Sequence, residues 1–460
     1  TITMSSIKLI IFDLDGVLVE AKNIHFDALN EALSTINPGY KIGWSEHLNQ
    51  YDGLKTFQKL DLLTKEKGLP KELHKDIWEK KQQLTLTKLS SLQPDDDLIA
   101  TLQLLYNQGF KLAVCSNSIR RTVLTVLAKL GLIEYLDLII SNEDVTNSKP
   151  HPEMYWKAIS TMSMLPEETL IVEDSPYGLL AAARSKSYIL RVKNPKEVTY
   201  KNIMNKVDTI DNGEKQLTPA WRDDNLTVLI PMAGAGSRFE QAGYTFPKPL
   251  IDVKGKPMIQ VVTENLNIKA NFVYVVQKAH RKKYNLDTLL NLITPNCKIV
   301  EVEGVTEGAA CTALLAKEHI DNDKPLFFAN SDQFVEWDSN EFLYKMNETE
   351  ADGGIVTFKA THPKWSFAKV NEEGLVTEVA EKNPISDTAT VGFYYWKKGA
   401  DFVKYAEQMI DKNVRVNSEF YVCPVFNEAI SDRKEIRIFN VKNMWGLGTP
   451  EDLKYYLENG

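Results

Sequence analysis

The sequence predicts two doubly wound α/β domains, of which the first carries an inserted α-helical cap. Two short apolar runs, residues 8–12 and 226–234, each lead into a glycine-containing loop and then into a helical pattern. Between them, apolar strand patterns alternate with helical ones, an order typical of a parallel sheet with right-handed crossovers. A length of 460 residues is sufficient for two such domains.

The first domain is predicted to span residues 5–210. Its opening strand, residues 8–12, is followed by a segment rich in Lys, Leu, Glu and Gln, residues 19–97, which we interpret as the helical cap. The strand and helix patterns then alternate. The strands are expected at 111–118, 136–141, 169–175 and 187–192, and the helices at 120–132, 151–165 and 178–186.

A linker is predicted at residues 211–224, where the apolar period is lost and Asp, Asn, Gly and Pro accumulate. The second domain then covers residues 225–460. Its opening strand is residues 226–234, and further strands are expected at 271–278, 298–304, 325–332, 353–360, 390–396 and 436–441.

The composition favours a small-molecule enzyme. The net charge is −8 and Lys/Arg runs are short, which argues against a nucleic-acid or anionic-membrane surface. The beginning of the sequence lacks the basic and apolar stretches of an export signal, and no apolar segment has the length of a membrane span. We therefore expect a cytoplasmic protein without nucleic-acid or membrane partners, and a homo-oligomer is possible.

Polar residues occur at four strand ends of the first domain, where ligands bind in open α/β sheets. A carboxylate nucleophile that attacks phosphorus approaches an anion, so its site needs a cation, a lysine and hydroxyl donors. The residues that fit these roles are Asp13, Asp15, Ser116, Asn117, Lys149, Glu173 and Asp174.

Each of these residues has an expected role. Asp13 is the predicted nucleophile and Asp15 the general acid and base, while Ser116, Asn117 and Lys149 bind the phosphoryl oxygens. Hard oxygen ligands for Mg²⁺ are expected from Asp13, Glu173 and Asp174, and from Asp15 through its backbone carbonyl. The polar cap residues expected nearest the pocket are Lys22, His25, Lys55 and Thr56.

These motifs resemble those of the haloacid-dehalogenase superfamily, in the group with a helical cap that includes β-phosphoglucomutase and phosphoglycolate phosphatase. The four motifs of that superfamily occur in order between residues 6 and 210. The resemblance implies an aspartyl-phosphate intermediate on Asp13, and the second aspartate, Asp15, favours phosphoryl transfer over dehalogenation.

The loop after residues 226–231 predicts a second phosphate site. It contains two glycines, whose backbone N–H groups can point at a triphosphate, and then Arg238 and Lys248 as cationic clamps. It is not a P-loop, because no Gly-Lys-Ser/Thr follows, and the dinucleotide fingerprint fails at Phe239. The nucleotide-binding residues expected from the loop are Ala233, Gly234, Ala235, Gly236 and Ser237.

This pattern is similar to the N-terminal signature of the sugar-phosphate nucleotidyltransferases, also called NDP-sugar pyrophosphorylases. The resemblance implies a Rossmann-like α/β fold with a mixed sheet, and Arg238 and Lys248 as catalytic residues. It also implies a nucleotide contact at Gly308, a Mg²⁺ ligand at Asp332, and sugar-phosphate contacts at Glu381 and Lys382.

Two departures from that family's pattern affect the expected site. Family members usually carry a second metal-binding Asp just before the final Gly-Thr, whereas this sequence reads Gly446-Leu447-Gly448-Thr449. Asp452, a water or a substrate oxygen is left to fill that place. The expected base-reading position holds Glu303, which can accept but not donate hydrogen bonds, so CTP or GTP is favoured over UTP or dTTP.

Together these features predict a bifunctional enzyme with Mg²⁺ at both sites. The second domain transfers NMP from an NTP to a sugar or polyol phosphate, and the first hydrolyses a related phosphate, in the synthesis of a capsule or surface polysaccharide precursor. Three alternatives stay open. The first domain is instead a sugar-phosphate mutase, or a non-catalytic docking module, or the two reactions are independent.

Overall fold

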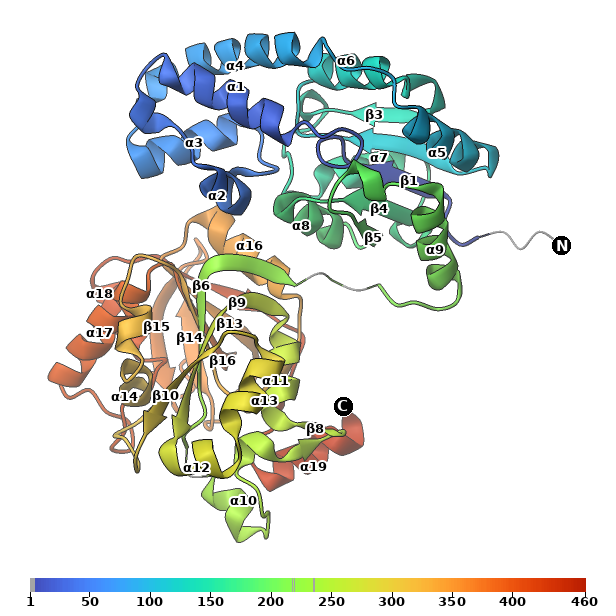
Figure 1. Ribbon diagram of the computed structural model, residues 1–460. Helices are drawn as coiled ribbons and strands as arrows, with labels where there is room; N and C mark the ends of the chain where they lie inside the picture. The colour runs from blue at the N-terminus through green and yellow to red at the C-terminus, as the bar shows by residue number, and fades with distance from the viewer. Residues whose placement is uncertain (1–4, 217, 219, 235) are drawn as a thin grey trace. The chain divides into compact units, whose positions relative to one another are not determined.

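The computed structural model describes residues 5–460 except 217, 219 and 235, and the chain forms two compact units, Thr1–Pro219 and Ala220–Gly460 (Figure 1). No helix within these described residues has both the length and the apolar character needed to cross a membrane.

A parallel five-stranded sheet forms the centre of the first unit, in the order β3-β2-β1-β4-β5. Because β1 is central and its two neighbours are wound in opposite directions, the topological switch point lies at its carboxyl end. The strands are β1 (Leu9–Phe12), β2 (Lys111–Cys115), β3 (Leu138–Ile140), β4 (Thr169–Glu173) and β5 (Tyr188–Arg191).

Both faces of this sheet are covered by helices. Ile10 and Phe12 of β1 pack into the core cluster that includes residues of α5, α6 and α9, whereas Leu9 and Ile11 pack into the cluster of α7 and α8. A strand buried on both faces needs a continuous apolar run, which explains the sequence Leu-Ile-Ile-Phe. These helices are α5 (Asp96–Asn107), α6 (Arg120–Leu130), α7 (Glu153–Thr161), α8 (Pro176–Arg184) and α9 (Tyr200–Asp211).

The cap is inserted between β1 and β2 and consists of helices with a separate apolar core (blue in Figure 1). Leu33 of its first helix and Leu60 of its third are fully buried there, together with Tyr51. The cap elements are α1 (Lys22–Ser34), α2 (Trp44–Glu46), the π-helical turn η2 (His47–Tyr51), α3 (Thr56–Lys67) and α4 (His74–Leu89).

A mixed nine-stranded sheet organises the second unit, with the main order β10-β9-β6-β11-β16-β13-β17. Strands β10, β9, β6 and β11 are parallel, whereas β16 runs antiparallel to β11 and β13. The strands are β6 (Trp221–Pro231), β9 (Ile268–Gln277), β10 (Lys298–Val302), β11 (Leu326–Ala329), β13 (Gly353–Lys359), β14 (Ser366–Val370), β15 (Val376–Glu381), β16 (Thr388–Trp396) and β17 (Ile436–Asn440).

Two further short sheets and a set of helices complete this unit. The short sheets pair β7 (Asp252–Val253) with β8 (Lys256–Pro257), and β12 (Gln333–Glu336) with β18 (Asn443–Gly446). The helices are α10 (Ser237–Gln241), α11 (Met258–Leu266), α12 (Lys278–Lys283), α13 (Leu286–Ile293), α14 (Ala309–Leu314), α15 (Lys317–Ile320), α16 (Ser339–Thr349), α17 (Gly399–Asp411), α18 (Val425–Ser431) and α19 (Pro450–Asn459).

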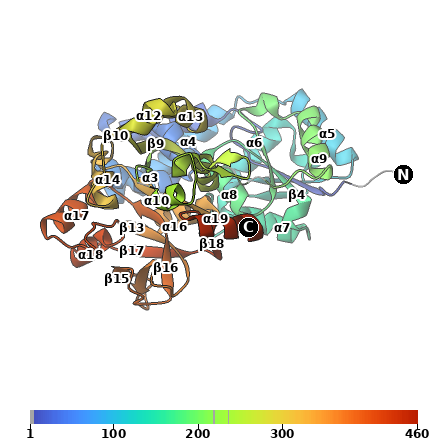
Figure 2. The ribbon, with the colours of Figure 1, turned by 90° about the horizontal axis from the view of Figure 1, so that it is seen from below.

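Helices α17 and α18 lie side by side in both ribbon views (Figures 1 and 2), and both contribute to the core cluster that contains Trp396 of β16. Trp396 at the end of β16 stacks on Phe426 of α18, with ring centroids 4.4 Å apart and an angle of 6° between the planes. This contact buries two large aromatic rings where the sheet meets the helix pair.

The predicted fold class is confirmed, with a parallel sheet and helical cap in the first unit and a mixed sheet in the second. Two segments differ from the sequence prediction. Residues 221–224 of the predicted linker belong to β6, where Trp221 pairs with Ile268. The hairpin of β14 and β15 was not predicted, because its exposed positions, such as Lys369 and Glu378, break up the apolar pattern.

Candidate active sites

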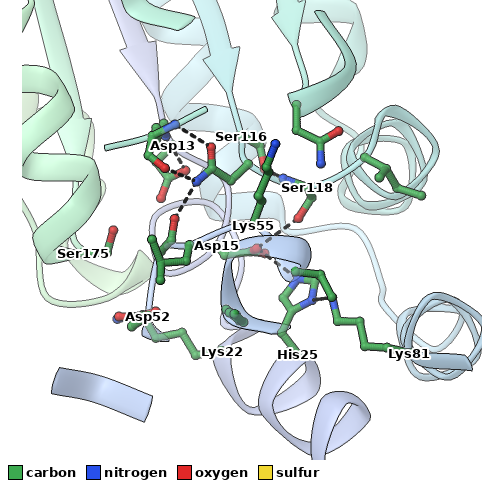
Figure 3. A pocket seen from close by; sticks show the side chains of 18 of the residues that line it. Asp13, Asp15, Lys22, His25, Asp52, Lys55, Lys81, Ser116, Ser118 and Ser175 are labelled. Atoms are coloured by element: carbon green, nitrogen blue, oxygen red, sulfur yellow. Dashed lines mark hydrogen bonds and ion pairs between the residues drawn. The ribbon is translucent and has the colours of Figure 1, made fainter. Parts of the chain in front are cut away.

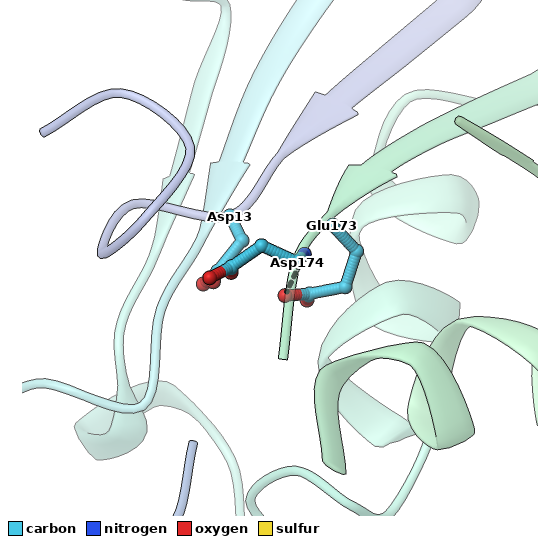
Figure 4. A group of neighbouring side chains, drawn as sticks. All are labelled: Asp13, Glu173 and Asp174. Atoms are coloured by element: carbon cyan, nitrogen blue, oxygen red, sulfur yellow. Dashed lines mark hydrogen bonds between the residues drawn. The ribbon is translucent and has the colours of Figure 1, made fainter. Parts of the chain in front are cut away.

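Three carboxylates of the first unit meet at the carboxyl ends of β1 and β4. Single oxygens of Asp13, Glu173 and Asp174 all lie within 4.8 Å of one another, and the three side chains are drawn in Figure 4. Asp13 follows β1 and Glu173 ends β4, and because the two strands are hydrogen-bonded neighbours, their ends bring these residues together.

Lys149 connects the carboxylates of this cluster. Its ammonium nitrogen lies 2.9 Å from Asp13 Oδ1 and 3.0 Å from Glu173 Oε2, and it donates to the carbonyl oxygen of Cys115 at 2.8 Å. The Tyr155 ring centroid is 4.9 Å from that nitrogen, and the Tyr155 hydroxyl donates to Glu173 Oε2. Lys149 is only 2% exposed, so its charge is held in place by fixed partners.

The backbone is shaped to let the carboxylates approach. A Cβ added to Gly16 would lie 2.1 Å from Asp174 Oδ2, and Gly16 has φ +85°, a conformation that side chains rarely adopt. Only glycine fits there without displacing Asp174.

A hydrogen-bonded chain leads from Asp15 into the cap (Figure 3). His25 Nε2 lies 3.0 Å from Asp15 Oδ2, and Lys81 Nζ lies 2.9 Å from His25 Nδ1. Burial alone would raise the pKa of Asp15, but His25, Lys81 and Lys59 outweigh it and lower that pKa. Burial lowers the pKa of Lys81 to about 7, with the charge of Lys59 contributing. The carboxylate of Asp15 therefore faces cap cations and stands outside the three-carboxylate cluster.

Asn117 joins the core to the cap. Its amide donates to Gly53 O at 2.6 Å and to Lys149 O at 3.0 Å, and it accepts from Lys149 N at 2.9 Å. The Asn117 side chain is thus committed to backbone groups, whereas Ser116, 2% exposed, lines the cavity with its neighbours. Because its side-chain amide is already engaged, the phosphate contact predicted for Asn117 would be made by its backbone N–H.

The first unit has a cavity of about 60 Å³ between the strand ends and the cap. The four cap residues singled out in the sequence, Lys22, His25, Lys55 and Thr56, all line it, together with Asp13, Asp15, Ser116, Asn117 and Lys149. Sequence reasoning missed His47, Asp52, Lys59 and Lys81, which also line it. Their signal was weak, because charged residues on helices are usually solvated.

The acidic cluster has the chemistry of a Mg²⁺ site. Burial first, then a neighbouring carboxylate, raises the pKa of Glu173 and that of Asp174 to about 7, so the apo cluster carries unfavourable repulsion. Asp174 Oδ1 is buried and lacks a hydrogen-bond partner among the described residues. Hard carboxylate oxygens that repel one another suit a divalent cation, so Asp13, Glu173 and Asp174 fit one.

In the second unit, Lys248 and Asp332 are brought together. Lys248 Nζ lies 3.0 Å from Asp332 Oδ2, and both residues line a cavity of about 530 Å³. Lys248 begins the turn η8 (Lys248–Leu250) after the loop that follows β6, and Asp332 follows β11, which is hydrogen-bonded to β6. The phosphate-binding loop and the predicted metal ligand thus meet at adjacent strand ends.

The predicted nucleotide-binding residues divide into two groups. Ala233, Gly234, Gly308 and Glu381 line the cavity with Lys248 and Asp332. The lining does not include Gly236, Ser237, Arg238, Glu303 or Lys382, and Ala235 lies outside the described residues.

Two of these outlying residues have other partners. The side chain of Glu303 is 75% exposed and pairs with Lys278 at 2.9 Å beside a separate surface depression. Lys382 Nζ donates to the hydroxyl of Tyr421 at 3.0 Å, and Tyr421 itself lines the cavity. Arg238 is exposed on α10.

Glu381 is the strongly perturbed carboxyl of the second cavity. Burial raises the pKa of Glu381 to about 7, although the charge of Lys382 opposes this rise. A carboxyl that is partly protonated near neutral pH can donate as well as accept hydrogen bonds, which suits contact with a hydroxyl-rich ligand.

The segment before the final Gly-Thr places two glycines against carboxylates. An added Cβ would lie 2.8 Å from Asp332 Oδ2 at Gly448, and 3.3 Å from Asp452 Oδ2 at Gly446. Asp452 therefore lies close to the place of a Gly446 side chain, and its Oδ1 is 3.8 Å from Lys364 Nζ. One carboxylate with nucleotide phosphates can hold Mg²⁺, so Asp332 fits such an ion without a second protein ligand.

Several lining residues of this cavity were not predicted. Trp365 and Ser366 reach it from the start of β14, and Thr390 and Tyr394 from β16. The lining residues of β16 are Thr390, Val391, Gly392 and Tyr394, and three of these, Thr390, Gly392 and Tyr394, share one face of the strand. The sequence does not show which aromatic residues of this strand line the cavity, and Trp396 belongs to the apolar core instead.

Comparison with known families agrees with this geometry. The haloacid dehalogenase-like hydrolase family matches residues 10–192, and the nucleotidyl transferase family matches residues 227–454.

Individual relatives match the separate halves. Pyrophosphatase PpaX of Halalkalibacterium halodurans is 30% identical over 178 residues, 38% of this chain and 78% of the relative. Phosphoglycolate phosphatase of Photorhabdus laumondii is 29% identical, over 39% of this chain and 77% of the relative. Among solved structures, the nucleoside-diphosphate-sugar pyrophosphorylase of Vibrio cholerae matches 50% of this chain and 100% of its own, with 24% identity and a TM-score of 0.44.

The predicted fusion is confirmed by the two family matches and the hydrolase relative. The chain belongs to the haloacid dehalogenase-like hydrolases through residues 10–192, carries a nucleotidyl transferase domain at residues 227–454, and is an enzyme with phosphatase and nucleotidyltransferase activities.

Proposed function

We propose that the first domain hydrolyses a sugar or polyol phosphate and that the second transfers NMP from an NTP to a sugar or polyol phosphate, releasing pyrophosphate. The observation that carries the first half is the convergence of Asp13 and Glu173 on Lys149, with Asp13 and Lys149 lining the cavity beneath the cap. The second half rests on the ion pair of Lys248 and Asp332 in the larger cavity.

Hydrolysis in the first domain takes two steps. A carboxylate oxygen of Asp13 attacks phosphorus while Lys149 and Ser116 hold the phosphoryl oxygens, and Asp15 gives a proton to the leaving oxygen. Asp15 then takes a proton from water, which attacks the phosphorylated Asp13 and frees phosphate. His25 fixes the orientation of Asp15 at 3.0 Å. A Mg²⁺ ion held by Asp13, Glu173 and Asp174 would neutralise phosphoryl charge.

Transfer in the second domain is a single displacement. An oxygen of the acceptor phosphate attacks the α-phosphorus of the NTP, and pyrophosphate leaves. Lys248 stabilises the charge that develops on the phosphates, with Arg238 as a second cation at the mouth of the loop. Glu381, which lines the same cavity, contacts the acceptor, and Asp332 would hold Mg²⁺, which offsets phosphate charge.

CTP or GTP is the proposed nucleotide, through acceptance of base amino groups by Glu303. Contact with a base requires Glu303 to leave Lys278, and an exposed ion pair of this kind is worth only about 0–1 kcal/mol. A clear preference for UTP or dTTP would disprove this assignment.

The relatives of the first domain are named for small phosphorylated substrates, pyrophosphate and phosphoglycolate, which supports a small substrate for its cavity. The role we propose for the whole enzyme is the cytoplasmic supply of an activated sugar or polyol for a capsule or surface polysaccharide.

A second candidate for the first domain is a sugar-phosphate mutase. The contact of His25 with Asp15 favours it, because a cap residue that holds the acid–base group can shield the phosphorylated enzyme from water. Product analysis distinguishes the two, since a hydrolase releases inorganic phosphate and a mutase an isomeric sugar phosphate.

The test is a screen with two readouts in Mg²⁺. Formation of the NDP-sugar or NDP-polyol is measured for four NTPs with a panel of sugar and polyol phosphates, and phosphate release for the same panel without NTP. Asp13→Asn should abolish only phosphate release, and Lys248→Ala only nucleotidyl transfer. Loss of both signals in either variant, or no phosphate release from any substrate, would contradict the proposed pair of activities.

A further inference from the structure

The cavity of the first domain contains more cationic groups than its carboxylates engage. Lys149 is paired with Asp13 and Glu173, and Lys22 with Asp174 and Asp52. The remaining carboxylate of the lining, Asp15, is engaged by His25, which is in turn bonded to Lys81. Two lysines of the lining, Lys55 and Lys59, have no ion pair or side-chain hydrogen bond within the described part of the chain.

Of these two lysines, Lys59 gives the stronger indication of an anionic ligand. It lies in the first turns of α3 and is 8% exposed, so its charge is almost removed from bulk water. An ammonium group on a largely buried residue without an ion pair is costly, and burial accordingly lowers the pKa of Lys59, while the charges of Asp52 and Asp15 oppose that effect. An anionic ligand in the cavity would supply the missing counter-charge.

Lys55 adds a second cation on the same side. It caps the start of α3, and its side chain extends towards Ser116 and Ser118 in Figure 3. The cavity thus has a phosphoryl site at the strand ends, formed by Asp13, Ser116 and Lys149, and a cationic side at the cap. A substrate that matches both ends carries an anionic group beyond the phosphoryl group that Asp13 attacks.

We propose that the first domain also hydrolyses pyrophosphate, and that the pyrophosphate released by the second domain of the same chain is the source. This inference rests on the proposed hydrolytic function of the same site. Pyrophosphate consists of two joined phosphoryl groups, one for the strand ends and one for Lys55 and Lys59. It is also more compact than a sugar or polyol phosphate, which suits the small cavity between the strand ends and the cap.

The reaction balances with water alone. Asp13 attacks one phosphorus, the bridging P–O bond breaks, and the leaving phosphate takes a proton from Asp15. Water then gives a proton back to Asp15 and attacks the aspartyl phosphate, so that one pyrophosphate and one water yield two phosphates. The second phosphate stays bound to the lysines until the cap opens.

For the whole enzyme, the consequence is that nucleotidyl transfer proceeds in the direction of the activated sugar or polyol. Nucleotidyl transfer breaks one phosphoanhydride bond and forms another, so the reaction is nearly balanced and pyrophosphate reverses it. Hydrolysis of pyrophosphate removes the substrate of the reverse reaction, so activation of the sugar or polyol becomes irreversible. Because both sites are on the same polypeptide, they are present at equal concentrations.

The experiment gives the full-length enzyme pyrophosphate alone with Mg²⁺ and measures inorganic phosphate, with p-nitrophenyl phosphate, a substrate with one anionic group, alongside. The expected result is two phosphates per pyrophosphate, lost in Asp13→Asn. Hydrolysis of p-nitrophenyl phosphate without hydrolysis of pyrophosphate would overturn this inference and leave the proposed function intact. Hydrolysis of neither would overturn both.

Lys59→Met tests the cationic side. The ratio of kcat/KM for pyrophosphate to that for p-nitrophenyl phosphate should fall by about tenfold or more, the usual effect of losing one charged hydrogen bond. Remaining p-nitrophenyl phosphate hydrolysis reports that the variant is folded, and Lys71→Met, an exposed lysine of the cap, is the matched control. An unchanged ratio in Lys59→Met would contradict the assignment.

A coupled reaction tests the source. With NTP and an accepted sugar phosphate, the wild-type enzyme should form NDP-sugar without accumulating pyrophosphate, whereas Asp13→Asn should accumulate one pyrophosphate per NDP-sugar. Accumulation of pyrophosphate by the wild type would show that the first domain does not consume it, and would reject the proposal.

Discussion

The ammonium nitrogen of Lys22 lies 2.7 Å from Oδ2 of Asp174, a carboxylate of the proposed Mg²⁺ site, and 3.4 Å from Oδ2 of Asp52. Lys22 is the first residue of the cap helix α1, so one side chain of the cap neutralises part of the acidic cluster of the core. A divalent cation that binds this cluster does so against the field of an ammonium group already in place.

Removing that ammonium should tighten metal binding. In Lys22→Met, we expect half-saturation by Mg²⁺ to fall by about tenfold, equivalent to about 1.4 kcal/mol of relieved repulsion. Phosphate release measured against Mg²⁺ concentration checks this. Lys8→Met, which removes an ion pair with Glu168 at the surface, should not change the half-saturation. A higher Mg²⁺ requirement in Lys22→Met would mean that Lys22 orients Asp174 rather than competing for it.

His47 should make the first domain sensitive to acid. It is 2% exposed, stacks on Trp44, and burial lowers its pKa to about 3. The unfolded chain binds a proton on this residue below about pH 6.5. The folded domain does not until about pH 3. Stability from this group is therefore complete above about pH 6.5 and is lost as the pH falls.

His47→Phe removes this linkage. Urea unfolding at pH 7.5 and pH 5 should show that the wild type loses about 2 kcal/mol more than the variant between the two values. His319→Gln, at a half-exposed histidine of the second unit, serves as control. Equal losses in the wild type and His47→Phe would show that His47 is protonated in the folded state.

Asn117 should affect turnover, because its amide holds both the Lys149 loop and the cap loop at Gly53. Asn117→Ala is expected to lower kcat for phosphate release by about tenfold to a hundredfold through displacement of Lys149. Tyr177→Phe removes a cap contact, the hydrogen bond from Tyr177 Oη to Gln50 O at 3.1 Å, and should act mainly on KM. Steady-state kinetics of both variants separate the two effects, and the reverse pattern would contradict these roles.

Gly448 should be essential to nucleotidyl transfer. The Cβ of Gly448→Ala would lie 2.8 Å from Asp332 Oδ2 and force that carboxylate away from Lys248. We expect about a hundredfold loss of kcat/KM for transfer with unchanged phosphate release. Gly446→Ala, whose Cβ meets Asp452 at 3.3 Å, should be milder. Equal rates in wild type and Gly448→Ala would show that the position of Asp332 does not limit transfer.

Residues at the ends of predicted strands could be placed from the sequence, whereas residues buried by the cap could not. Asp13 and Glu173 could be placed together because each ends an apolar strand of a parallel sheet. Lys59 and Lys81 could not, since nothing local distinguishes a lysine buried under a cap from one in solvent. The base-reading role of Glu303, predicted from its spacing from Gly308, stays a prediction, and spacing alone could not report the ion pair of Glu303 with Lys278.

The central place of β1 also has a consequence for how the chain is made. β1 lies between β2 and β4, and both of these strands follow the cap in the sequence. During synthesis β1 therefore stays unpaired while the cap helices, whose contacts are local, fold against one another. Each compact unit is one uninterrupted stretch of chain. The hydrolase half can therefore complete its fold while the ribosome is still producing the transferase half.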